Sequence, residues 1–108
     1  MDKVEVKKAI MKIINSSPGL KRDYNILLKN KGGYMKNIVH EHCNGLDNKY
    51  LADTIRYSIA NNEEETKTMY KNIINLKVKN NMEKAVGHKI SANAFGEIMN
   101  EVLDDLVE

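Results

Sequence analysis

The run His40, Glu41, His42 and Cys43 brings together the imidazole, carboxylate and thiol groups that bind metal ions or carry out acid–base and nucleophilic chemistry. On a helix, His40 and Cys43 share a face because they are three residues apart, whereas His42 points elsewhere. A structural zinc site needs four converging ligands, and the only other histidine is His88. The sequence therefore predicts no metal site and no cofactor, but a buried cysteine with histidines at the edge of the core.

Motifs for enzyme chemistry are missing from the rest of the sequence. Gly32 and Gly33 lack the following Lys-Ser or Lys-Thr of a phosphate-binding loop. Residues 87–95 look like the second half of an EF-hand calcium loop, but Ala94 stands where that loop needs a bidentate glutamate. The acidic residues lie mostly at positions expected to be exposed, and none pairs with another as acid and base. We therefore expect a protein that is not an enzyme and acts through its surface.

The charges of the 108 residues are unevenly distributed, although the net charge is only +2. Residues 1–49 carry ten basic and five acidic side chains, whereas residues 82–108 carry two and six. A basic half can approach phosphate by releasing counterions, or it can simply be a solvated lysine-rich surface. The length, the apolar fraction of 42% and the lack of a run of about 18 apolar residues predict one cytoplasmic domain, residues 1–108, with no membrane partner.

Apolar residues recur at intervals of three and four, which predicts an all-α fold, a compact bundle of five or six short helices. The first helix spans about residues 3–15, and Ser17 with Pro18 starts the second, which we expect to end at Gly32 and Gly33. The residues expected to face the core in the first five helices are Val6, Ile10, Ile13, Ile14, Leu20, Tyr24, Leu27, Leu28, Met35, Ile38, Val39, Leu51, Ala52, Ile55, Ile59, Met69, Ile73, Ile74 and Leu76.

Polar residues and glycines mark the ends of the next helices. Gly45 should end the third helix in the left-handed conformation. Asp47 is the expected N-terminal cap of the fourth helix, and Asn61 or Asn62 that of the fifth. Three glutamates at positions 63–65 follow, where the helix dipole stabilises negative charge.

Two structures remain open for residues 76–91. In one, the fifth helix continues through Val78 and Met82, and Gly87 ends it. In the other, Leu76 and Val78 alternate with lysines as a short strand, and a turn leads to a second strand, which together form a small β-wing. The continuous helix is the preferred prediction.

The last helix should follow Ser91 or Asn93 and has the clearest apolar stripe in the sequence. Its C-terminal end is acidic, which the helix dipole disfavours, so either this end frays or a basic surface compensates. The core of a 108-residue chain can be too small to bury the apolar sides of all its helices. We therefore expect a homodimer that buries the apolar side of this last helix. The predicted dimer interface consists of Phe95, Met99, Val102 and Leu106.

Two segments resemble the helix-turn-helix and winged-helix families of DNA-binding proteins. Residues 10–20 are similar to the opening helix and Pro-Gly turn of many winged helices, and residues 50–55, with Leu-Ala-Asp, to the start of a positioning helix. The resemblance implies a helix-turn-helix core, a recognition helix over residues 64–76 and a wing around residues 76–91. The sequence departs from the family in a longer turn without glycine and in the glutamates at 63–65, which would repel phosphate at the major groove.

The same resemblance implies a set of DNA-contacting residues, most of them on the polar positions of the fifth helix, where we also place Tyr70. Some would face DNA directly and the others would touch its backbone. The implied contacts are Lys67, Thr68, Lys71 and Asn72, with Lys77, Lys79, Lys21 and Arg22 on the backbone.

The function predicted from the sequence is that of a small, dimeric, non-enzymatic DNA-binding regulator or accessory protein. The alternative is a helical protein–protein interaction module, such as a phage- or plasmid-type inhibitor or adaptor. Binding to duplex DNA that weakens steeply with salt would favour the first function over the second.

Overall fold

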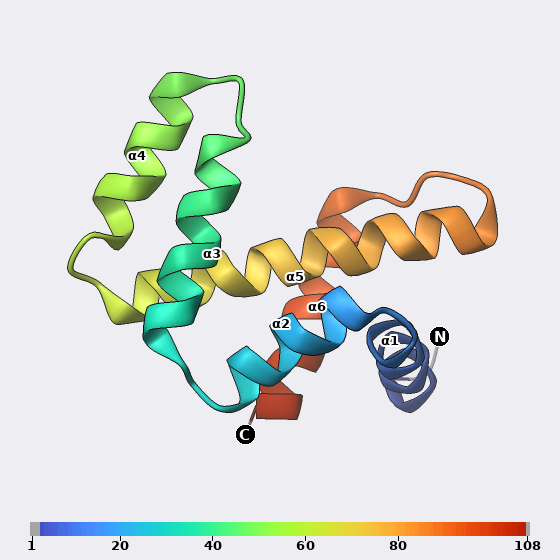
Figure 1. Cartoon of the computed structure of the whole chain (residues 1–108). Helices are drawn as coiled ribbons and strands as arrows, with labels where there is room; N and C mark the ends of the chain where they lie inside the picture. The colour runs from blue at the N-terminus through green and yellow to red at the C-terminus, as the bar shows by residue number, and fades with distance from the viewer. Residues whose placement is uncertain (1–2, 108) are drawn as a thin grey trace.

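In the computed structural model, which describes residues 3–107, the chain forms six α-helices and no strand (Figure 1). The predictions of an all-α fold and of the number of helices are confirmed for these residues. The helices are α1 (Lys3–Ser16), α2 (Pro18–Leu28), α3 (Gly32–Asn44), α4 (Lys49–Ile59), α5 (Glu63–Val86) and α6 (Ala92–Val107).

Side-chain caps begin three of these helices. Ser17, Asn48 and Asn62 each accept a hydrogen bond from the backbone N–H three residues later, at donor–acceptor distances of 3.5, 3.0 and 3.0 Å. Such caps satisfy N–H groups that have no partner inside the helix. Ser17 and Asn62 were predicted as caps, whereas the cap of α4 is Asn48, one residue after the predicted cap, Asp47.

One predicted helix end and one predicted cap conformation are wrong. Helix α2 ends at Leu28, and the chain turns at Asn30, whose φ of 51° lies in the left-handed region that asparagine tolerates. Gly32 and Gly33 therefore begin α3 instead of ending α2. Gly45 follows α3 with a φ of −86°, so it is not a left-handed cap.

The preferred structure for residues 76–91 is confirmed, and the β-wing is wrong. Helix α5 continues without a break to Val86, and Gly87 ends it with a φ of 80°, which favours glycine. Val78 is fully buried while Leu76 is 47% exposed. The apolar residues of this segment thus follow the helical stripe, and the alternation with lysines does not form a strand.

Helix α5 is the central element of the bundle, and each of the other five helices packs against it. Figure 1 shows α3 and α4 side by side and antiparallel at the N-terminal end of α5, with α1 and α2 along its length and α6 behind it. The radius of gyration of 14.0 Å is close to the roughly 13 Å expected of a compact chain of about this size. No helix among residues 3–107 has the combination of length and apolar composition needed to cross a bilayer.

Most of the predicted core residues are buried, with informative exceptions. Tyr70, which we placed among polar positions, is fully buried, whereas Leu28, Leu51 and Leu76 are exposed. The side chain of Val6 lies outside the described residues. The buried apolar core consists of Ile10, Ile14, Leu20, Tyr24, Leu27, Met35, Val39, Cys43, Ala52, Ile59, Tyr70, Ile73, Ile74, Val78, Phe95, Met99, Val102 and Leu103.

The residues predicted as a dimer interface serve the fold of the single chain instead. Phe95, Met99 and Val102 are buried in the common core, because α6 packs its apolar stripe against α5. They therefore offer no surface to a second copy, and the side chain of Leu106 lies outside the described residues. Near the end of α6, Asp104 forms an ion pair with Lys71 of α5, so a basic side chain of the same chain compensates that acid.

Candidate functional site

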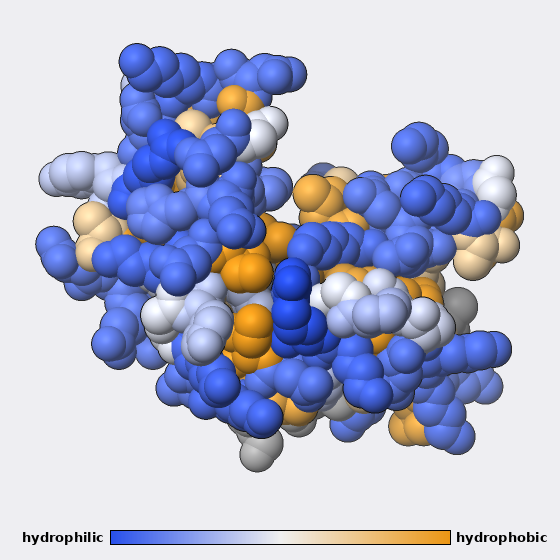
Figure 2. Space-filling view, viewed as in Figure 1, coloured by the Kyte–Doolittle hydropathy of each residue, from blue (hydrophilic) through white to orange (hydrophobic). Residues whose placement is uncertain are grey.

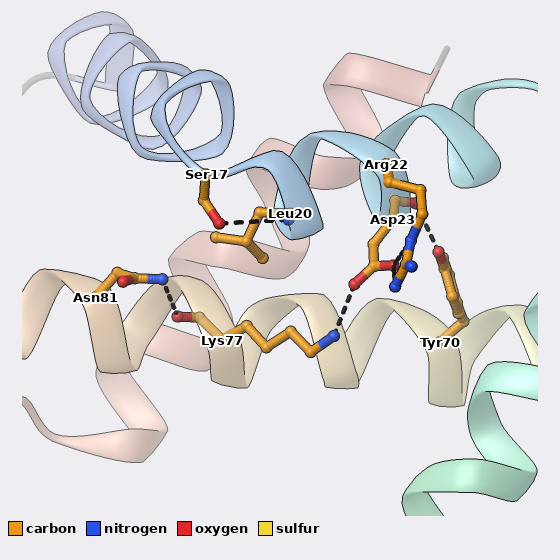
Figure 3. A network of polar contacts seen from close by, with 7 residues as sticks. All are labelled: Ser17, Leu20, Arg22, Asp23, Tyr70, Lys77 and Asn81. Carbon is orange, nitrogen blue, oxygen red and sulfur yellow. Dashed lines mark hydrogen bonds and ion pairs between the residues drawn. The ribbon is translucent and has the colours of Figure 1, made fainter.

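A buried carboxylate, Asp23, joins α2 to α5 (Figure 3). Its side chain is only 1% exposed. Lys77 Nζ lies 2.7 Å from Asp23 Oδ2, and Arg22 lies 3.3 Å from the other oxygen. The Tyr70 hydroxyl donates to the Asp23 backbone carbonyl oxygen at 2.6 Å. Lys77 and Tyr70 of α5 thus hold α2 on the central helix, whereas Arg22 pairs with Asp23 within α2 itself.

The Tyr70 hydroxyl keeps its proton at neutral pH and so remains a hydrogen-bond donor. Burial, followed by the negative charge of Asp23, raises the pKa of Tyr70 well above its ordinary value. Neither the buried position of Asp23 nor that of Tyr70 was predicted from the sequence. A signal for Asp23 exists, because it lies three residues after Leu20 and four before Leu27 and so belongs to the apolar side of α2.

With the inner side of α2 attached to α5, its outer side and the turn that follows it present four basic residues and one asparagine. We call Lys21, Arg22, Asn25, Lys29 and Lys31 the α2 basic face. Together with Pro18 and Ile26, they line a shallow hollow of about 430 Å³. Counted from Lys21, the next three members lie one, four and eight residues further along the chain, which places all four along one side of a helix. Hydrophilic side chains also cover most of the view in Figure 2, with apolar surface near its centre and in smaller areas toward its edges.

The α2 basic face lies in the most positively charged part of the chain. Residues 6–40 contain eight lysines and arginines and one acidic residue, a net charge of +7 with histidine neutral. The one acid is Asp23, which is buried and already paired with Lys77 and Arg22. Its charge therefore does little to neutralise the lysines on the surface of α2, and this surface attracts anions.

The lysines predicted to contact DNA from α5 are in a different environment. Lys71 pairs with Asp104, Lys77 with Asp23, and Lys79 with Glu83 at 3.6 Å. Three of the α5 contacts predicted from the sequence are therefore engaged in ion pairs within the chain.

The other α5 residues of that prediction do not form one surface with α2 either. Thr68 is exposed and donates to the Glu64 carbonyl oxygen, Asn72 is exposed, and Lys67 is half-buried. Helix α5 is also covered by five other helices, whereas a recognition helix needs one side free to enter the major groove. Of the predicted contacts, only Lys21 and Arg22 lie together on an open basic face.

The histidines and the cysteine considered as metal ligands or nucleophile do not converge on one site. Cys43 is buried, as predicted, His40 is half-buried on α3, and His88 is exposed beyond the end of α5. Among the residues that the structure describes, no three histidine, cysteine or acidic side chains are grouped so that they could hold a metal ion.

The loop between α5 and α6 is held by one carboxylate. Glu83 accepts a hydrogen bond from the Ile90 backbone N–H at 2.7 Å and pairs with Lys79. The hydrogen bond from the Ile90 N–H is the largest cause and lowers the pKa of Glu83 below its ordinary 4.5. Burial, the next largest cause, opposes it, and the positive charges of Lys79 and then Lys89 lower the pKa further. Because the folded-state pKa is lowered, this contact stabilises the fold above about pH 4.5, and the stabilisation is lost as pH falls through the lowered pKa.

We expect exchange of the Ile90 amide hydrogen to report this contact. On acidification below the ordinary pKa of glutamate, protection of the Ile90 N–H should decrease by more than the protection of the core amides of α5. In Glu83→Gln, whose amide oxygen can still accept but carries no charge, protection should be lower at neutral pH and should no longer change with acid. Glu41→Gln, an exposed glutamate on α3, should leave Ile90 exchange unaltered. Equal exchange in wild type and Glu83→Gln at both pH values would contradict the contact.

The outer side of α4 is the second unusual surface. Tyr50 and Tyr57 are 82% and 87% exposed and lie two turns apart on the same side of the helix. Tyrosine is enriched at interfaces, since its ring offers a large contact area at a small cost in conformational entropy.

Comparison of the chain with protein families, curated proteins and solved structures found no significant match to any of them. The function must therefore be argued from the two surfaces themselves.

Proposed function

We propose that this protein is a non-enzymatic DNA-binding accessory protein that holds the phosphate backbone with the α2 basic face. The observation that carries the proposal is the clustering of Lys21, Arg22, Lys29 and Lys31 around one hollow in a segment whose sole acid is buried. This differs from recognition by α5, because the basic surface is on α2 and the first turn of α5 carries three glutamates.

The spacing of the α2 basic face suits a chain of phosphates. Lys21 and Lys29 are eight residues apart, which corresponds to roughly 12 Å along a helix axis. A DNA strand carries one phosphate per roughly 3.4 Å of its axis, so the face spans about three or four phosphates. Contacts of this kind give affinity and position without reading base edges, and we therefore expect little dependence on sequence.

The test is the salt dependence of DNA binding for two matched variants. In Lys21→Gln/Lys29→Gln/Lys31→Gln, three charges are removed from the α2 basic face while Arg22 is left to pair with Asp23. In Lys49→Gln/Lys84→Gln/Lys89→Gln, three charges are removed from exposed positions elsewhere. Binding to labelled duplex and single-stranded oligonucleotides is measured by fluorescence anisotropy from about 50 mM salt upward.

We expect the wild type to bind at low salt, with an affinity that falls as salt rises. Each lost phosphate contact reduces the slope of log K against log salt by about 0.7 to 0.9, so the α2 variant should lose about two units. Its affinity near 50 mM salt should fall at least tenfold, by order of magnitude. The control variant should keep the wild-type slope to within about half a unit. Lack of binding to either form of DNA, or equal losses in the two variants, would overturn the proposal.

A protein partner is the second candidate, and the exposed Tyr50 and Tyr57 favour it. On this function, α4 docks its tyrosines into a partner, and the protein is a helical interaction module. Tyr50→Ala/Tyr57→Ala would then abolish recovery of a specific partner from a native lysate and leave the DNA affinity unchanged. Recovery of the same partner by the double variant would remove this candidate.

A further inference from the structure

We infer that the DNA held by the α2 basic face is single-stranded, with one base stacked on Tyr34. This inference rests on the proposed DNA binding and names the form of DNA that the same surface takes. It is carried by an observation apart from the charge, the position of an exposed aromatic ring at the end of the basic face.

Tyr34 lies in the first turn of α3, directly after the turn that leads out of α2. Its side chain is 59% exposed. The Lys31 ammonium lies over its ring at 5.3 Å from the centroid, and Lys31 also lines the hollow of the α2 basic face. The basic face therefore leads directly to an exposed aromatic ring, one face of which the Lys31 ammonium covers.

A basic surface followed by an exposed ring is the combination that binds single strands. The charges follow the backbone, and a base stacks on the ring, as any base can, so binding depends little on sequence. In a duplex, the faces of the bases are covered by their neighbours, so no base could stack on Tyr34. Lys31 adds a positive charge next to the ring, where the phosphate beside a stacked base would lie.

The other exposed tyrosines provide a matched control. Tyr50 and Tyr57 are more exposed than Tyr34, but they lie on α4, which Figure 1 shows beyond α3 from α2. If exposure alone made a tyrosine bind bases, then Tyr57 would matter at least as much as Tyr34. If proximity to the α2 basic face is what makes a tyrosine bind bases, only the substitution of Tyr34 should weaken binding of single-stranded DNA.

The experiment compares wild type, Tyr34→Ala, Tyr34→Phe and Tyr57→Ala on three probes of about 12 nucleotides: oligothymidylate, a duplex, and oligouridylate. Anisotropy gives the affinities, and the intrinsic fluorescence gives a second readout. The chain has no tryptophan and five tyrosines, of which Tyr24 and Tyr70 are buried, so quenching by DNA reports the exposed ones.

We expect wild type to bind oligothymidylate more tightly than the duplex at equal salt, with quenching of tyrosine fluorescence. Tyr34→Ala should weaken oligothymidylate binding by roughly tenfold, leave duplex binding unchanged and lose most of the quenching. Tyr34→Phe should retain the affinity because the ring remains, and Tyr57→Ala should behave as wild type.

The outcomes separate this inference from the proposed function. Equal weakening of single-stranded and duplex binding in Tyr34→Ala, or no weakening at all, would overturn the stacking on Tyr34 while DNA binding by the α2 basic face stands. Tighter binding to oligouridylate than to oligothymidylate would overturn the assignment to DNA. Lack of binding by wild type to any of the three probes would overturn the proposed function itself.

Discussion

Replacement of Ile74 by alanine should lower the free energy of unfolding by about 3 kcal/mol, the largest effect that we expect from one substitution in this chain. Ile74 is fully buried in α5, the helix against which the other five pack. The shorter side chain removes apolar contacts and leaves a cavity, which a core closed on all sides cannot collapse to fill. A loss of this size is a large part of the roughly 5–15 kcal/mol that stabilises a typical domain.

The measurement is urea unfolding followed by circular dichroism, with Leu76→Ala as the matched control on the same helix. Leu76 is exposed, and its truncation should change the free energy of unfolding by no more than about 0.5 kcal/mol. The slope of the free energy against urea should be the same for both variants and wild type. Similar losses in the two variants would contradict the burial pattern of α5 and the central position of this helix.

Replacement of Lys77 by methionine should lower the free energy of unfolding by about 2 kcal/mol, the second largest effect that we expect. Methionine retains most of the length of the lysine chain but removes the cation that lies 2.7 Å from Asp23. The buried carboxylate would then keep only Arg22, at 3.3 Å and from a side chain that is largely in water. Breaking a buried ion pair often costs about 3–5 kcal/mol, and we expect less here because Lys77 itself is partly exposed.

A double-mutant cycle isolates the contribution of the ion pair. Asp23→Asn removes the buried charge, so Asp23→Asn/Lys77→Met should be more stable than the sum of the two single losses predicts, by at least about 1 kcal/mol. Lys84→Met, an exposed lysine on the same helix, serves as the control and should be close to neutral. Additive losses in the cycle would show that Lys77 and Asp23 do not interact in solution.

The same cycle bears on the proposed DNA site. Asp23, Tyr70 and Lys77 hold the inner side of α2 on α5, and the α2 basic face is the opposite side of that helix. Lys77→Met should therefore weaken DNA binding only to the extent that it unfolds the protein, whereas the triple α2 variant should weaken binding without loss of stability. This contrast separates residues that bind the ligand from residues that position them.

Much of the fold could be predicted because helix formation is local. The spacing of Ile10 and Ile14, the cap at Ser17 and the helix end at Gly87 each act over a few residues, and each prediction is confirmed. The continuous α5 was preferred for the same reason, since the apolar stripe through Val78 has helical spacing. The end of α2 was placed too late because Asn30, in the left-handed conformation, makes the turn that Gly32 was expected to make, and at Gly45 the helix ends as predicted but without the left-handed conformation.

The candidate site was predictable only in part. Lys21 and Arg22 were named from the sequence, but Lys29, Lys31 and Tyr34 were not, because nothing local shows that the turn after α2 brings them together. The family resemblance instead directed attention to α5, whose lysines the structure uses in ion pairs.

The sequence by itself determined which segments are helices, which side of each helix is apolar, and that the first half of the chain is basic. Only the tertiary structure decided which polar residues go inside and which basic ones remain free. Asp23 can be buried only because Tyr70 and Lys77, 47 and 54 residues later, arrive beside it. A helix needs partners a few residues away, whereas a buried charge needs partners from another helix, and packing alone supplies them.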